Sequence, residues 1–268
     1  SNCRASHLNA AGAFIVLARA GFVHPIEGLL TDPWLIKVRN GEVLWERILD
    51  IGDGRALAPS GDGGVVISTP WAGFDGRRLL KLDANGNIQI SHVLSVSTPK
   101  GFAASDTRDQ LRKDHDGFIL LTNHLTGADG EELEFGRGGL LRVDAELRPV
   151  WRRSFDFLGN VGSDAAGQDQ RIISMDAVDA DGDNQRDDGY VVLVEASGGF
   201  AQVMRLEPDG QVRWARDYFL NGARLHKPRV RAMSDGGFVV GATTDGFSRQ
   251  SAEQDPITGL TRLRSSGQ

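Results

Sequence analysis

Five copies of one phrase recur along the 268-residue chain, and this repetition constrains the fold more than any other feature. Each copy is a turn rich in Gly and Asp followed by a short apolar run: NAAGAFIVLA from Asn9, SGDGGVVIST from Ser60, KDHDGFILLT from Lys113, DDGYVVLVEA from Asp187 and SDGGFVVGAT from Ser234. A second apolar run follows each copy and carries one central basic residue: Lys37, Lys81, Arg142, Arg205 and Arg262. A period of roughly 45 to 60 residues is that of a single supersecondary unit.

Two further segments complete each unit. A phrase after the basic residue, such as GEVLWERI or RPVWRRSF, places Trp45, Trp151 and Trp214 at equivalent positions, with Ile90 in the second copy. One more short apolar piece, such as RALAPS or RIISMDAV, precedes each turn. The segments are rich in β-branched and aromatic residues, and none keeps a period of 3.6. We therefore expect four β-strands per unit, named A to D in chain order.

Four short antiparallel strands at this period predict an all-β fold, a β-propeller of about five four-stranded blades. A lone sheet cannot cover both of its faces, so blades stack and the Trp positions pack between them. We expect residues 1–268 to form a single propeller domain, with blades at approximately 3–50, 51–94, 95–156, 157–219 and 220–268. The last blade is incomplete, because Gln268 falls where its strand D should begin. An open solenoid and, more weakly, a β-sandwich are the alternative architectures.

Composition narrows the class of partner. The formal net charge is -6 and the sequence pI is about 5.5, so a broad basic surface for nucleic acid is missing. No run of eighteen apolar residues predicts a transmembrane segment. The single cysteine, Cys3, excludes an internal disulfide. Cys3 is a candidate lipid-anchor site, as the first residue of a mature bacterial lipoprotein, or else a small buried residue of a first strand.

The fourth unit contains an acidic insertion between its A and B strands, within VDADGDNQRDDGYVV. Asp179, Asp181, Asp183 and Asp187 occupy positions 1, 3, 5 and 9 of this loop, and Gln185 at position 7 would supply a backbone carbonyl. Carboxylates this close repel one another unless a cation neutralises them, and oxygen ligands at flexible spacing favour Ca²⁺ over zinc or copper. We therefore predict a structural Ca²⁺ site at these five residues, with a solvated acidic turn as the alternative.

This loop resembles the calcium hairpin of the FG-GAP repeats of integrin-type propellers, whose pattern is D-x-D-x-D-G-x-x-D before an apolar strand. Asn184 replaces the glycine of that pattern. The resemblance covers one blade and implies that the four Asp side chains are the ligands. The wider repeat, DGGxVV…LxKLDxxGxxxW, resembles bacterial secreted or lipoprotein propellers of the quinoprotein-like group. Because weak Ca²⁺ sites are typical of extracellular modules, we expect an extracytoplasmic location: periplasmic, cell-surface or secreted.

In a propeller, the D-to-A and B-to-C connections share one face. That face receives the long segments of this chain, among them residues 19–33, which we expect to be irregular. Binding residues concentrate in loops held by a rigid scaffold, and the candidate ligand contacts are Trp71, Phe74, His124, Arg137, Arg224 and His226. We expect a non-catalytic, Ca²⁺-stabilised module that binds a protein or carbohydrate through this long-loop face.

Enzymatic activity is not indicated by any motif. The chain contains no G-x-S-x-G, H-E-x-x-H, P-loop or dinucleotide-binding motif. The alternative function is a polysaccharide-acting hydrolase or lyase whose site lies on the same long-loop face, where paired carboxylates would do the acid and base work.

Overall fold

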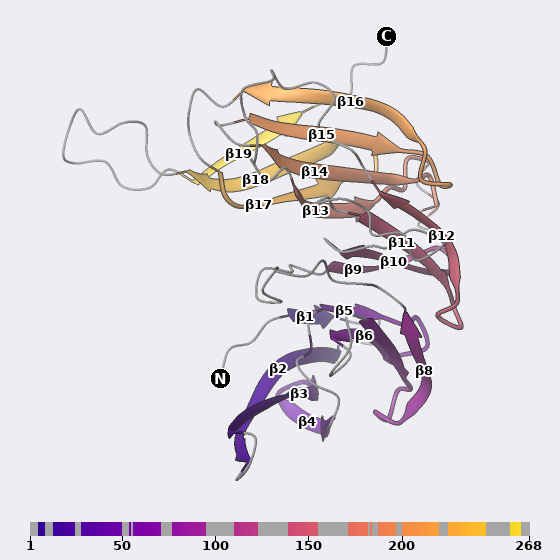
Figure 1. Ribbon diagram of the computed structural model, residues 1–268, viewed down its shortest axis with the longest axis vertical. Helices are drawn as coiled ribbons and strands as arrows, with labels where there is room; N and C mark the ends of the chain where they lie inside the picture. The colour runs from indigo at the N-terminus through magenta and orange to yellow at the C-terminus, as the bar shows by residue number, and fades with distance from the viewer. Residues whose placement is uncertain are drawn as a thin grey trace, which may run out of the picture. The chain divides into compact units, whose positions relative to one another are not determined.

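The structure is a computed structural model that describes residues 5–8, 13–24, 28–49, 54, 56–70, 77–94, 110–122, 139–154, 171–181, 183, 187–196, 200–219, 225–244 and 258–263. Within these ranges all helical or strand structure is β-strand, as Figure 1 shows. The strands form five sheets that follow one another along the chain.

Four of the sheets have four strands each. The first contains β1 (Ala5–Leu8), β2 (Ala13–His24), β3 (Gly28–Arg39) and β4 (Glu42–Ile48). The second contains β5 (Ala56–Pro59), β6 (Val65–Pro70), β7 (Arg77–Leu82) and β8 (Ile88–Leu94). The third contains β9 (Gln110–Asp114), β10 (Gly117–Thr122), β11 (Gly139–Asp144) and β12 (Pro149–Ser154). The fourth contains β13 (Arg171–Ala177), β14 (Tyr190–Ala196), β15 (Phe200–Leu206) and β16 (Val212–Phe219).

The fifth sheet has three strands in the part of the chain that the structure describes. They are β17 (Leu225–Ala232), β18 (Phe238–Thr244) and β19 (Thr258–Leu263). In every sheet the strand order follows the chain, and the pairs whose register is described are antiparallel. This up-and-down order is that of a propeller blade. The predicted fold class, an all-β propeller of about five four-stranded blades, is confirmed, and the incompleteness of the last blade stays a prediction.

The strand register shows that the repeated phrases occupy equivalent positions. The central basic residue of the C strand pairs with the same B-strand position in four sheets: Lys37 with Ile15, Lys81 with Val66, Arg205 with Val191 and Arg262 with Val239. In three sheets the C–D register shifts by one residue directly after this basic residue. The resulting bulge leaves one D-strand residue without a pairing partner in each sheet: Leu44, Gln89 and Arg213. The next residue is Trp45, Ile90 or Trp214, and a bulge changes the direction of the side chain beside it.

The chain divides into two compact units, Ser1–Leu133 with Leu141–Val150, and Glu134–Leu140 with Trp151–Gln268. In the first unit, one apolar cluster joins the first and second sheets and another joins the second and third. In the second unit, a cluster joins the fourth and fifth sheets. Consecutive sheets therefore bury each other's faces within each unit. A single domain over residues 1–268, and its blade boundaries, stay predictions.

This packing explains the sequence pattern of the B strands. Val65, Val66 and Ile67 of β6 are all fully buried, as are Val192 and Leu193 of β14. A strand covered on both faces needs apolar residues at successive positions, which is why these runs do not alternate. The D strands are the opposite case, because β4 and β8 expose most of their residues.

The segment expected to be irregular at residues 19–33 is strand over residues 19–24 and 28–33. β2 and β3 pair without interruption from Ala13↔Arg39 to His24↔Gly28, so the hairpin extends far beyond the other B–C pairs. Apolar and β-branched residues such as Phe22, Val23 and Thr31 favour strand. Because both β2 and β3 contain such residues, the two strands can pair along this length. The described residues include no helix long and apolar enough to cross a membrane.

Side chains of β13 satisfy backbone groups at the edge of β17. The amide N–H of Val230 donates to Ser174 Oγ at 3.1 Å, and the amide N–H of Ala232 donates to Asp176 Oδ2 at 3.2 Å. Ser174 and Asp176 are buried, with 0% and 3% of their surface exposed. Two edge N–H groups of the fifth sheet, that of buried Val230 and that of half-buried Ala232, thus find acceptors in the fourth sheet.

Candidate cation site

The acidic insertion forms the A–B hairpin of the fourth sheet, as the repeat predicts. β13 ends at Ala177, and two backbone bonds extend its pairing with the start of β14: Val178 N–H to Gly189 O at 2.9 Å and Asp188 N–H to Val178 O at 3.2 Å. Gly189 has a φ of 97°, and a Cβ there would lie 2.1 Å from the carbonyl oxygen of Leu206. The base of the loop is therefore held by the sheet, and only glycine fits its last position.

Three carboxylates meet above this base. One carboxylate oxygen each from Asp179, Asp181 and Asp188 lies within 4.8 Å of the others. Asp179 and Asp188 are half-buried and Asp181 is exposed. Asp188 Oδ2 accepts the N–H groups of Ala180 at 2.5 Å and Asp181 at 3.3 Å, which folds the loop back over it. Three converging carboxylate oxygens could hold a hard metal ion.

The remaining predicted ligands are placed differently. Asp183 and Asp187 are exposed and do not belong to the group of three. The amide N–H of Asp183 donates to Asp181 Oδ1 at 3.1 Å, so Asp183 helps to shape the loop through its backbone. Gln185 lies outside the described residues. As ligands, Asp183, Gln185 and Asp187 stay predictions.

The ligand spacing counted from Asp179 selects Asp187 and passes over Asp188. The phrase that ends the hairpin is the sequence signal that indicates Asp188. Asp188–Gly189–Tyr190 matches Asp116–Gly117–Phe118 of the third hairpin, and Gly117 and Gly189 meet the equivalent carbonyl oxygens of Val143 and Leu206. Asp188 therefore belongs to the repeat, whereas Asp179 and Asp181 belong to the insertion.

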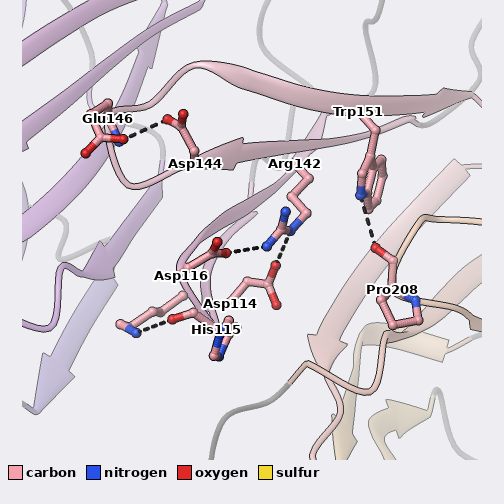
Figure 2. A network of polar contacts seen from close by, with 9 residues as sticks. Asp114, His115, Asp116, Arg142, Asp144, Glu146, Trp151 and Pro208 are labelled. Atoms are coloured by element: carbon pink, nitrogen blue, oxygen red, sulfur yellow. Dashed lines mark hydrogen bonds and ion pairs between the residues drawn. The ribbon is translucent and has the colours of Figure 1, made fainter.

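In the third hairpin the basic residue of the C strand neutralises the equivalent acid. Arg142, the basic residue of β11, donates from Nε to Asp114 Oδ2 at 2.6 Å and from Nη2 to Asp116 Oδ1 at 2.5 Å, as Figure 2 shows. Asp114 is buried, with 2% of its surface exposed. In the second hairpin Gly63 stands at the position of Asp116, and Lys81 Nζ lies 4.0 Å from Oδ2 of Asp62, one residue earlier.

The fourth hairpin departs from this arrangement. Arg205, the basic residue of β15, donates to three backbone carbonyl oxygens: Asp188 at 2.5 Å, Leu206 at 3.0 Å and Tyr190 at 3.2 Å. Val178 stands where the third hairpin has Asp114. Among the described residues, no carboxylate lies within ion-pair distance of Arg205, so the Asp188 side chain is left to the acidic loop.

Burial lowers the pKa of Arg205 from its ordinary value, and the charge of Arg213 acts in the same direction, whereas Glu207 and Asp188 raise it. Arginine nevertheless keeps its charge at neutral pH. As a buried cation that binds carbonyl oxygens, Arg205 holds the base of the hairpin and makes no ion pair with the Asp188 carboxylate.

The predicted ligand face falls mostly outside the described residues. Trp71, Phe74, His124, Arg137 and Arg224 lie there. His226 is in β17, where its backbone pairs with Thr243. The structure does not bring these six residues together as a described site, and their role stays a prediction.

No family model and no curated protein matches this chain. Among solved structures it is similar to a protein of unknown function from Bacteroides caccae, at 12% identity and a TM-score of 0.45 over 94% of this chain and 72% of that one. It is also similar to a quinoprotein alcohol dehydrogenase-like protein from Bacteroides thetaiotaomicron, at 12% identity and a TM-score of 0.42 over 76% of this chain and 43% of that one. A third is a sucrose-6-phosphate hydrolase from Lactobacillus gasseri, at 11% identity and a TM-score of 0.44 over 94% of this chain and 56% of that one.

These similar structures thus include an enzyme and a protein of unknown function. Likeness at this identity and TM-score assigns neither a family nor an activity, and the fold assignment rests on the sheets themselves.

Proposed function

We propose that the A–B hairpin of the fourth sheet binds Ca²⁺ and that the protein is a non-catalytic, extracytoplasmic propeller module. The observation that carries the cation site is the convergence of one carboxylate oxygen each from Asp179, Asp181 and Asp188. In the third hairpin Arg142 pairs with the equivalent Asp116, whereas Arg205 binds the backbone carbonyl oxygen of Asp188. The arrangement of donors supports Ca²⁺, because carboxylate oxygens with open positions for water suit a hard cation and a flexible coordination number.

The cation would act on stability. Three carboxylates within 4.8 Å repel one another when the site is empty, and a cation that binds only the folded hairpin stabilises the fold by mass action. A Ca²⁺ concentration one hundred times the dissociation constant adds about 2.7 kcal/mol. For a chain of this size that corresponds to a rise of roughly 5 to 10 °C in Tm.

The test is thermal unfolding of the wild-type protein and of Asp181→Asn/Asp188→Asn, each in chelator, in Ca²⁺ and in Mg²⁺. We expect Ca²⁺ to raise the wild-type Tm and to leave the double variant unchanged, with a weaker effect of Mg²⁺. Asp116→Asn is the matched control, because it removes a carboxylate from the equivalent place in the third hairpin and should keep the full Ca²⁺ response. An equal response in wild type and double variant, or none in the wild type, overturns the site.

The remaining parts of the proposal rest on the sequence. The long segments between the repeated phrases, which contain Trp71, Phe74, His124, Arg137, Arg224 and, at the start of β17, His226, support binding of a protein or carbohydrate. A Ca²⁺-stabilised fold supports an extracytoplasmic location with a lipid anchor at Cys3. Membership of the quinoprotein-like repeat group is part of the same proposal.

A glycan array run beside hydrolysis and lyase assays on the same polymers tests this second part. Retention of a polymer that stays intact supports the binding module. Release of shortened or unsaturated products from the polymer overturns the non-catalytic assignment in favour of the hydrolase or lyase.

A further inference from the structure

The first and second sheets are joined by a tryptophan that caps a glycine turn. The indole Nε1–H of Trp45, in β4, donates to the carbonyl oxygen of Ala84 in the β7–β8 turn at 2.8 Å. Gly86 of the same turn has a φ of 81°, and a Cβ there would lie 3.1 Å from two ring atoms of Trp45. The indole ring thus occupies the space that any larger turn residue would need.

The same pair recurs between the third and fourth sheets. The indole Nε1–H of Trp151, in β12, donates to the carbonyl oxygen of Pro208 in the β15–β16 turn at 3.0 Å, as Figure 2 shows. Gly210 of that turn has a φ of 82°, and its Cβ would lie 3.0 Å from the Trp151 ring. These contacts lie within the second compact unit, and those of Trp45 lie within the first.

The junction between the second and third sheets changes both members of the pair at once. Ile90 of β8 stands where the other junctions have tryptophan, and Leu147 of the β11–β12 turn stands where they have glycine. Leu147 keeps the left-handed conformation, with a φ of 64°, and is fully buried. Ile90 packs against the apolar cluster that contains Leu147.

A leucine in this conformation needs a physical reason, because the left-handed region is unfavourable for residues with a Cβ. Volume supplies it. Isoleucine is much smaller than tryptophan, so glycine opposite Ile90 would leave a void between the sheets, and voids in a packed interior are destabilising. The side chain of Leu147 fills that space from the other side of the junction.

The turn carbonyl of this junction keeps a lysine donor although the indole donor is missing. Ala145 occupies the place of Ala84 and Pro208 in its turn, and its carbonyl oxygen accepts a bond from Lys81 Nζ at 3.4 Å. Lys81 is the basic residue of β7, whose counterpart Lys37 reaches Ala84 O alongside Trp45. The turn carbonyl therefore has a donor at each of the three junctions whose C–D turn lies within the described residues.

We propose that each D strand and the C–D turn of the following sheet form a size-matched pair, either Trp with Gly or Ile with Leu, and that this match specifies which sheets pack together. The inference concerns sheet specificity and is independent of the proposed cation site.

Exchange of the pairs tests it. Ile90→Trp should be overpacked against Leu147 and Leu147→Gly should leave a cavity, each lowering Tm by about 3 to 10 °C. The double variant Ile90→Trp/Leu147→Gly rebuilds the pair of the other junctions and should recover most of that loss. For the reverse exchange, the Tm loss of the double variant Trp45→Ile/Gly86→Leu should likewise be smaller than the sum of the Tm losses of its two single variants.

The matched control combines the same kinds of substitution across different junctions. Trp45→Ile/Leu147→Gly alters two residues that are not partners, so its Tm losses should add. A single variant that fails to fold while its matched double folds supports the pairing. Additive losses in both matched exchanges, or matched doubles that fail to fold, overturn it.

Discussion

Arg205 donates a hydrogen bond to the backbone carbonyl oxygen of Asp188 at 2.5 Å, while the carboxylate of Asp188 accepts the N–H groups of Ala180 and Asp181. In the third sheet the equivalent arginine binds the carboxylate itself. The two hairpins thus differ in the acceptor atom: the arginine pairs with the carboxylate of Asp116 in the third and with the backbone carbonyl oxygen of Asp188 in the fourth. The buried valine at position 178, in place of Asp114, removes the other carboxylate that such an arginine would bind.

Asp188→Asn should have opposite effects with and without Ca²⁺. Without the ion, loss of one of three repelling carboxylates should leave the free energy of unfolding unchanged or raise it by up to about 1 kcal/mol. With millimolar Ca²⁺ the variant should be less stable than wild type, because it lacks a charged ligand. Urea unfolding in chelator and in Ca²⁺ measures both. Lower stability of the variant by the same amount in both conditions would mean that Asp188 only folds the loop.

Gly189→Ala should strongly destabilise the fourth hairpin. Its Cβ would lie 2.1 Å from Leu206 O, and a backbone atom within a sheet cannot move aside easily. We expect a loss of at least about 2 kcal/mol in the free energy of unfolding. Gly41→Ala is the control, because Gly41 has a φ of 83° but no atom near its Cβ, and should cost only about 1 kcal/mol of backbone strain. Chemical denaturation of both variants checks the difference. Equal losses would assign the Gly189 effect to strain alone.

Asp176→Ala should weaken the contact between the fourth and fifth sheets. The variant leaves the Ala232 N–H without its carboxylate acceptor and removes the ion pair with Arg231 at 3.5 Å. An unpaired buried N–H costs about 1 to 3 kcal/mol. Hydrogen exchange should show faster exchange at Ala232 and unchanged exchange in β6 of the other compact unit. Ser174→Ala should affect Val230 in the same way. Unchanged protection at both amides would contradict the role of these side chains.

Lys81→Met should destabilise the junction between the second and third sheets. The substitution keeps an apolar stem but removes the donor to Ala145 O, the acceptor that has no indole donor at this junction. We expect a loss of about 1 to 3 kcal/mol. In Lys81→Met/Ile90→Trp/Leu147→Gly the new indole should supply the missing donor and reduce this loss. A loss of the same size in both backgrounds would show that Lys81 acts in another way.

Acid should reduce the contribution of Asp83 to stability. The backbone N–H and side-chain amide of Asn87, together with the N–H groups of Asn85 and Gly86, hold the pKa of Asp83 below its ordinary value of 3.8, although desolvation opposes them. A depressed folded-state pKa contributes stability that is present above the unfolded value and lost as the pH falls through the folded one. Unfolding measured between pH 5 and pH 2 should therefore show a shallower acid loss in Asp83→Asn. Identical pH profiles would contradict it.

The repeat could be recognised without coordinates because every copy obeys the same local rules. Turn residues precede an apolar run, and the basic residue of each C strand falls opposite the same B-strand position, as with Lys81 and Val66. The prediction of an irregular segment at residues 19–33 was wrong for residues 19–24 and 28–33, because β2 and β3 pair over a greater length than the other described B and C strands.

The sequence by itself determined the strands, their grouping into five sheets and the hairpin that carries the acidic loop, because turn chemistry and hydrophobic patterning act between near neighbours. Only the tertiary structure decided that Asp188 joins Asp179 and Asp181, and that Ile90 and Leu147 replace a tryptophan and a glycine. Both outcomes depend on which atoms meet across a hairpin or between two packed sheets. Spacing along one strand cannot specify such contacts, because each is a property of two surfaces.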